Sequence, residues 1–209
     1  MADIERGAAE ARLKLLRAQI EPHFLFNTLA NLQALIGADP PRAQKMLGHL
    51  DGYLRATLAS TRNDSSTLAR EFALLTAYLE IISIRMGPRL AYSLDLPEAL
   101  AAVRLPPMLL QPLVENAIRH GLEPKVEGGS VQVAASEASG ALVLTVEDDG
   151  LGPAPDAAGR GPAATAGSGV GLAHVRERLA TLYGAAGSCD CAAMPGGGTR
   201  VTLRLPLQR

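Results

Sequence analysis

The chain has 209 residues, with 20 lysines and arginines against 21 aspartates and glutamates and a formal net charge of −1. This balance provides no general basic field, so we expect no nucleic-acid partner. A hydrophobic content of 47% is enough for a packed core, and two cysteines exclude a disulfide scaffold. No apolar run approaches the roughly 18 residues of a membrane span. The expectation is a cytoplasmic protein of one large domain or two small ones.

The first 88 residues have the pattern of helices, because apolar side chains recur at spacings of three and four. Pro22 separates two phases of the first apolar stripe, since proline removes a backbone donor and kinks a helix. Glycine and prolines in residues 37–41 turn the chain back, which predicts an antiparallel helical hairpin. The helices are expected at residues 8–36, 42–59 and 67–86.

Beyond Gly87-Pro88 the pattern changes to strands that alternate with two helices. Residues 150–170 are mostly glycine, alanine and proline, which is typical of a functional or disordered loop. We therefore divide the chain into a helical region, residues 1–88, and an α/β domain, residues 89–209. Strands are expected at residues 90–96, 130–136, 141–147, 187–193 and 199–205, and helices at 107–120 and 171–183.

Two glycine-rich segments flank this loop. In residues 148–152, Asp-Asp-Gly-Leu-Gly, a carboxylate at a strand end can accept a hydrogen bond from a ligand amine, and the glycines allow close approach. Residues 167–171, Gly-Ser-Gly-Val-Gly, lead into a helix whose N-terminal N–H groups suit phosphate. Taken alone, the first segment is more simply an acidic turn, and the second is equally compatible with a flexible loop.

Residues 110–121 place polar side chains on two flanks of a predicted helix. Asn116 and His120 lie four residues apart on one flank, and Glu115 and Arg119 on the other. An amide oxygen is a hard ligand that suits Mg²⁺, and the two basic side chains can complement phosphate charge. The alternative interpretation is an ordinary solvated polar face.

A histidine, His23, lies in a segment that also holds Pro22 and two of the three phenylalanines, Phe24 and Phe26. A neutral imidazole nitrogen is a competent nucleophile toward phosphorus. A single histidine on a helix is more often a packed or solvated residue. The neighbouring proline and the paired phenylalanines argue against that simple interpretation.

The order and spacing of these segments together resemble a known family. Residues Gln19–Asn27 closely resemble the phosphoacceptor box of LytS-like sensor histidine kinases, and Gln111–Gly121 resembles the N box of the GHKL (Bergerat-fold) ATP-binding domain. Asp148–Gly152 and Gly167–Gly171 are similar to its two glycine boxes, and Gly198-Thr199 to its closing Gly-Thr. The resemblance implies an α+β chain: a helical hairpin that dimerises to a four-helix bundle, then an α/β sandwich of the Bergerat type.

The resemblance also implies roles for individual residues. His23 would accept the phosphoryl group, and Asn116 would ligate Mg²⁺, with Glu115 nearby to aid water or metal. Asp148 would accept a hydrogen bond from the adenine amine, supported by Thr199. The implied cofactors are ATP and Mg²⁺, and the implied nucleotide-binding residues are Asn116, Arg119, His120, Asp148, Gly150, Gly152, Gly167, Gly169, Gly171 and Thr199.

The sequence departs from the family pattern at three places. Asp149 stands where asparagine is common, and His174 stands where asparagine often follows the second glycine box. Phe24 directly follows His23, where other histidine kinases carry an acidic base. Glu21 would point elsewhere on a straight helix, so the general base is unassigned.

The implied function is that of the catalytic region of a two-component sensor kinase: ATP-dependent phosphorylation of His23 and transfer to an aspartate of a cytosolic response regulator. The implied partners are that regulator and a second copy in a homodimer, with a membrane only through a sensor region absent from this chain. A flexible Gly87-Pro88 junction would let the ATP-binding domain reach His23. Transfer within one subunit and between subunits both stay open, and we favour transfer between subunits.

Two alternatives belong to other functional classes. One is a GHKL nucleotide-binding switch without kinase activity, and the other is a GHKL ATPase or a serine-directed kinase. Neither would need His23 in its Pro-His-Phe context.

Overall fold

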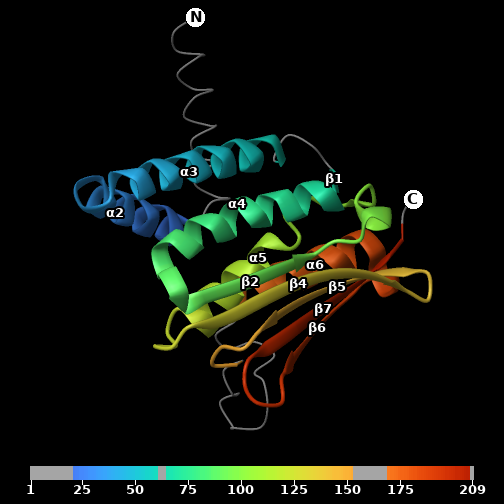
Figure 1. Cartoon of the computed structure of the whole chain (residues 1–209). Helices are drawn as coiled ribbons and strands as arrows, with labels where there is room; N and C mark the ends of the chain where they lie inside the picture. The colour runs from blue at the N-terminus through green and yellow to red at the C-terminus, as the bar shows by residue number, and fades with distance from the viewer. Residues whose placement is uncertain (1–20, 61–64, 153–168, 208–209) are drawn as a thin grey trace, which may run out of the picture.

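The computed structural model describes residues 21–60, 65–152 and 169–207. In these residues, helices precede a mixed sheet that is covered by further helices (Figure 1). The α-helices are α2 (Pro22–Ala38), α3 (Pro40–Ser60), α4 (Leu68–Met86), α5 (Gln111–Asn116) and α6 (Gly169–Tyr183). Short helical turns are η1 (Gly87–Arg89), η2 (Glu98–Leu100), η3 (Ala117–Leu122) and η4 (Gly184–Ala186). The strands are β1 (Ser66–Thr67), β2 (Leu90–Asp95), β3 (Arg104–Leu105), β4 (Gly129–Ala138), β5 (Ala141–Asp148), β6 (Ser188–Ala193) and β7 (Thr199–Pro206).

The helix starts and ends agree with the sequence except at two places. Pro22 is the first residue of α2, and Glu21 before it has non-helical angles (φ −57°, ψ 118°). The proline was expected to kink one long helix, but it instead begins a helix. The helix expected over residues 107–120 is shorter, because α5 ends at Asn116 and continues as the π-helical turn η3. Residues 8–20 of the first expected helix lie outside the described residues.

The main sheet has five strands in the order β2-β4-β5-β7-β6. β2 pairs with β4 in parallel, and the remaining pairs are antiparallel. Every strand expected after residue 88 is present, which confirms the α/β part of the prediction. In the register of β5 and β7, Asp148 pairs with Thr199, so two residues 51 positions apart meet at one end of the sheet.

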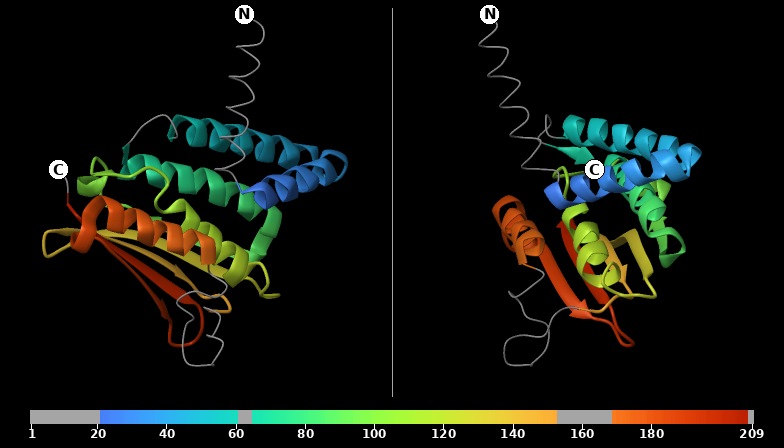
Figure 2. Two further views of the ribbon diagram at one scale, coloured as in Figure 1. Left: turned by 180° about the vertical axis from the view of Figure 1, so that it is seen from behind. Right: turned by 90° about the vertical axis from the view of Figure 1, so that its left-hand side faces the viewer.

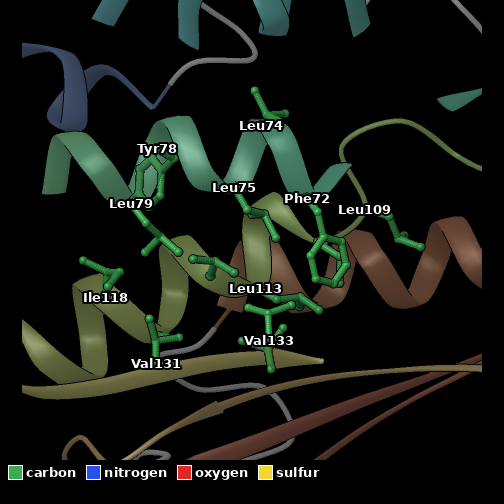
Figure 3. Packing of buried hydrophobic residues seen from close by; sticks show 14 of the residues in the cluster. Phe72, Leu74, Leu75, Tyr78, Leu79, Leu109, Leu113, Ile118, Val131 and Val133 are labelled. Carbon is green, nitrogen blue, oxygen red and sulfur yellow. The ribbon is translucent and has the colours of Figure 1, made fainter. Parts of the chain in front are cut away.

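Helices α4, α5 and α6 lie on one side of the sheet, and the hairpin of α2 and α3 lies beyond α4 (Figures 1 and 2). Helix α4 is buried on two faces because it packs against α3 above and against α5 and β2 below. Figure 3 shows its apolar side chains above those of α5, η3 and β4. The contacting residues include Phe72, Leu75, Leu79, Leu113, Ile118, Val131 and Val133, all buried.

The Gly87-Pro88 junction is held by hydrogen bonds and is not a free linker. The Arg89 guanidinium donates to three backbone carbonyls, those of Glu123, Lys125 and Val126. On the other side, the Arg42 guanidinium of α3 donates to the Ile84 carbonyl. The hairpin and the sheet domain therefore have a defined relative position in this structure.

Candidate active site

Asp148 ends β5 in a buried position, with 5% of its surface exposed. The Gly150 N–H donates to its Oδ1 at 3.0 Å, and the Thr199 N–H and hydroxyl also donate to the carboxylate. Burial raises the pKa of Asp148 above its usual range, although these hydrogen bonds oppose the rise. Thr199, which was expected to support Asp148, thus lies opposite it in the sheet and donates to its carboxylate, while the role of Asp148 toward adenine stays a prediction.

Three glycines surround Asp148 because no side chain fits there. A Cβ on Gly121 would lie 2.6 Å from the Asp148 Oδ1, and a Cβ on Gly150 would lie 2.4 Å from the Gly121 backbone. Gly198 has φ +90°, and its Cβ would lie 1.9 Å from the Asp148 carbonyl oxygen. Gly152, also predicted as a site residue, has φ +80° and faces Gly198. The first glycine box therefore packs directly on the end of the N-box segment.

Asn116 lies against the first turn of α6. A Cβ on Gly171 would be 2.9 Å from the Asn116 Nδ2, so the N box and the second glycine box lie in contact. Gly169 is the first residue of α6, and the predicted Gly167 lies outside the described residues. His120 is exposed on η3, where partial burial and then the Arg119 charge lower its pKa and favour the neutral imidazole.

The side-chain amide oxygen of Asn116 is chemically suited to bind Mg²⁺. Asn116 is half-buried, and no hydrogen bond within the described part of the chain occupies its side chain. Within the same residues, no group of three or more His, Cys, Asp or Glu side chains could hold a metal ion. Mg²⁺ keeps waters and phosphates as most of its ligands, so one amide oxygen beside a nucleotide suffices for it.

Glu115 faces a different direction from its neighbour Asn116. The Gln111 Nε2 donates to the Glu115 Oε1 at 2.8 Å and lies 3.2 Å from the Tyr53 hydroxyl of α3. Burial raises the pKa of Glu115 to about 7. The carboxylate therefore adjoins the hairpin that carries His23, whereas Asn116 adjoins the glycine-rich turn of α6.

His23 lies in the first turn of α2 and is exposed. The next residue, Phe24, is buried against Tyr53 and Tyr78, with ring centroids 5.4 and 5.0 Å apart. One turn later, the Asn27 amide nitrogen is 3.1 Å from the His23 Nε2. The aromatic contact anchors this turn of the hairpin and leaves the imidazole at the surface.

A pocket joins His23 to the N box within one chain. Arg119 forms an ion pair with Glu21, and Arg85 at the end of α4 forms one with Glu123. Glu21 was expected to point away from His23, but it precedes the helix and turns into the same pocket. A proline at the first helical position is the signal that could have predicted this. The pocket is lined by Glu21, His23, Phe24, Tyr78, Arg85, Arg119 and Glu123.

Comparisons with known proteins identify the family. Residues 104–209 match the family described as histidine kinase-, DNA gyrase B- and HSP90-like ATPases, and residues 11–90 match the family described as histidine kinases. The chain belongs to the histidine kinases. Its helical part and its ATPase-like domain thus correspond to the catalytic region of a sensor histidine kinase, which confirms the resemblance to the LytS type.

Several sensor kinases are similar over nearly the whole chain. The sensor histidine kinase BtsS of Escherichia coli is 36% identical over 94% of this chain. YesM and LytS of Bacillus subtilis are 32% and 31% identical over 94% and 96% of it. The chain spans about a third of the length of these relatives, 34%, 33% and 34% respectively.

The catalytic domain of the histidine kinase ThkA, in a nucleotide-free crystal form, has the same fold. It superposes with a TM-score of 0.52 at 14% sequence identity and covers 69% of this chain and 97% of its own. This similarity confirms the fold class of the ATP-binding part. None of the helices in the described residues is long and apolar enough to cross a membrane.

Proposed function

We propose that the chain binds ATP with Mg²⁺ and phosphorylates its own His23. The observation that carries this proposal is the pocket in which His23 and the N-box residue Arg119 lie together. A phosphoacceptor and a cationic residue of the nucleotide site are thus adjacent in one chain. A nucleotide switch without kinase activity would not need this arrangement.

ATP would bind with its adenine amine on Asp148 and its phosphates between η3 and the start of α6. The support for this orientation is the buried acceptor at one end and, at the other, the Arg119 guanidinium with the His120 imidazole, which can donate a hydrogen bond in its neutral form. Asn116 would hold Mg²⁺, which supplies charge neutralisation on the phosphates when bound. Gly169 and Gly171 would offer backbone N–H groups to the phosphates.

In the reaction, a neutral ring nitrogen of His23 attacks the γ-phosphorus. The nitrogen–phosphorus bond forms while the bond from that phosphorus to the β–γ bridging oxygen breaks, and ADP leaves. The other ring nitrogen then loses its proton to solvent or to a base. Positioning and charge stabilisation account for most of the catalysis in such a transfer, and the contact of Phe24 with Tyr53 would help to position His23.

The partners we propose are a second copy of the chain and a response regulator. Phe26, Leu29 and Ile36 share one face of α2, opposite Phe24, and are 72, 45 and 62% exposed. Covering this stripe with the same stripe of a second hairpin would form a four-helix bundle. The phosphoryl group would then pass from His23 to an aspartate of a regulator in the cytoplasm.

Labelling with ATP that carries γ-³²P tests the proposal. The wild-type chain should acquire a label that is labile in acid and stable in alkali, as a phosphoramidate is. His23→Gln should bind ATP yet stay unlabelled, because glutamine has no nucleophilic ring nitrogen, and EDTA should abolish the wild-type label. Acid-stable labelling of His23→Gln would instead support a serine-directed kinase, and ATP binding without any label would support a switch.

A further inference from the structure

Arg85 is the most enclosed cation of the His23 pocket, and nothing in the nucleotide motifs accounts for it. It ends α4, its side chain is 15% exposed, and its guanidinium pairs with the carboxylate of Glu123. Arg119 on the other side is 48% exposed and pairs with Glu21. Two arginines thus line the same pocket as His23, and each is paired with one carboxylate.

The charges of this pocket are balanced only before phosphorylation. Among the described residues that line it, two guanidinium groups and two carboxylates sum to zero, whereas a phosphoryl group on a side chain adds a charge of about −2. That charge would arise on an exposed imidazole, but the Arg85 side chain in the same pocket is only 15% exposed, so water screens its attraction less than that of a fully exposed cation. A guanidinium has five N–H donors in a planar fork, which matches the oxygens of a phosphoryl group as well as those of a carboxylate.

We propose that Arg85 binds the phosphoryl group on His23 and that Glu123 occupies this arginine in the unphosphorylated state. On transfer, phosphoryl oxygens replace the Glu123 carboxylate on the guanidinium. This inference rests on the proposed function, because it assigns a binding residue to the product of that reaction. Arg85 would stabilise the negative charge during transfer and slow the subsequent hydrolysis of the phosphohistidine.

A purely structural role for Arg85 makes a different prediction. If the arginine only fastens Glu123, and with it the end of η3, then removing either partner breaks the same ion pair and has the same effect. If Arg85 binds phosphate, the two substitutions have opposite effects. Arg85→Gln removes the phosphate ligand, whereas Glu123→Gln removes the carboxylate that competes for it.

The experiment compares Arg85→Gln, Glu123→Gln and the double variant with the wild type. Three quantities are measured: the dissociation constant for ATP, the initial rate of His23 labelling, and the half-life of the label after ATP is removed. We expect Arg85→Gln to label about 10- to 100-fold more slowly and to lose its label faster, with unchanged ATP affinity. Glu123→Gln should label faster than the wild type. Arg70→Gln, an exposed arginine on the same helix, is the matched control and should behave as the wild type.

Arg85→Gln alone leaves the Glu123 carboxylate without its partner and could therefore fail to fold. The double variant removes both charges of this pair, so it keeps the test valid. It should fold and still label slowly. Equal losses in both single variants with recovery in the double variant would overturn the proposal in favour of a structural ion pair. Wild-type labelling rates in a folded Arg85→Gln would overturn it as well. A wild-type chain that binds ATP and acquires no label would instead refute the proposed kinase function.

Discussion

Asp148 is a buried carboxylate whose hydrogen bonds from Gly150 and Thr199 leave acceptor capacity for a ligand. Asp148→Asn should weaken ATP binding by roughly 5- to 150-fold, because a buried amine of the ligand would face an amide donor in place of an acceptor. Isothermal titration calorimetry measures the change. The exposed Asp190→Asn is the matched control and should bind as the wild type. Unchanged affinity in a folded Asp148→Asn would refute the adenine assignment.

The raised pKa of Glu115 predicts that the free energy of unfolding depends on pH. Its pKa is raised by burial from 4.5 to about 7, so the folded chain binds this proton more tightly than the unfolded chain. The associated stability is fully present below pH 4.5 and is lost as the pH rises through about 7. Glu115→Gln, which is neutral throughout and still accepts from Gln111, should exceed the wild type at pH 8 by on the order of 1–3 kcal/mol.

Urea denaturation of both chains at pH 5 and pH 8 measures this difference. At pH 5 the gap between the two free energies of unfolding should be much smaller than at pH 8, because the carboxyl of the folded wild type is then still protonated. A constant gap between the two chains at both pH values would show that Glu115 is already ionised at pH 5.

At the residue scale, the sequence predicted the contacts that lie within motifs. Thr199 was expected to support Asp148, and the two residues are paired across β5 and β7, whereas the contact of Asn116 with Gly171 was not foreseen. Glu21 was predicted to point away because it was assumed to continue a straight helix, whereas Pro22 starts the helix after it. The sequence could not predict that Arg85 lies near His23. Arg85 belongs to no nucleotide-binding motif, and it meets Glu123 only because α4 packs near the end of η3.

Among the elements, the first glycine box and η3 form one interlocked unit. The Leu151 N–H donates to the Gly121 carbonyl at 3.1 Å, and Gly150 lies directly on the Gly121 backbone. Gly150→Ala should therefore displace the turn and reduce ATP affinity by roughly tenfold or more, because its Cβ would lie 2.4 Å from backbone atoms of Gly121, which cannot rotate away as a flexible side chain can. Fluorescent-nucleotide titration measures this loss.

Gly48→Ala on α3 is the control for this substitution. Its Cβ would meet nothing within 4 Å, and alanine is favoured over glycine in a helix by about 0.5–1 kcal/mol. That variant should bind nucleotide normally and unfold at a slightly higher urea concentration. Normal nucleotide binding by Gly150→Ala would show that the box tolerates a side chain and that its close packing is not required.

The elements themselves were predicted well, and the π-helical turn was not. Helix and strand periodicities of 3.6 and 2 are visible in the spacing of apolar residues. A turn with bonds between residues five apart, such as the Glu123 N–H to the Ile118 carbonyl, has no such spacing. It arises where Gly121 has to approach Asp148, a contact between residues 27 positions apart.

For the whole molecule, the shared pocket of His23 and Arg119 now leads us to favour transfer within one chain over transfer between subunits. Mixing His23→Gln with Asp148→Asn separates the two geometries. The first chain binds ATP without an acceptor, and the second has the acceptor without ATP. We expect only background labelling after mixing, because transfer within one chain needs His23 and Asp148 in the same chain.

Subunit exchange has to be verified in the same experiment by co-purification of differently tagged chains. Given exchange, labelling of the Asp148→Asn chain at about half the wild-type level would establish transfer between subunits. The overall arrangement that underlies this prediction was only partly visible in the sequence. The contacts that hold the helical hairpin and the sheet domain in place depend on residues such as Arg42 and Arg89, whose carbonyl partners are remote in sequence.

The double burial of α4 has a consequence for engineering. A chimaeric kinase is commonly assembled by joining one protein's input region to another protein's output domain at an apparent boundary, and Gly87-Pro88 looks like such a boundary in the sequence. A cut there would separate α4, which has eleven buried side chains, from α5 and β2, against which one of its two buried faces packs. Grafts made ahead of Glu21 would keep α2, α3 and α4 with their native partners, so fusion points should be sought on that side of His23.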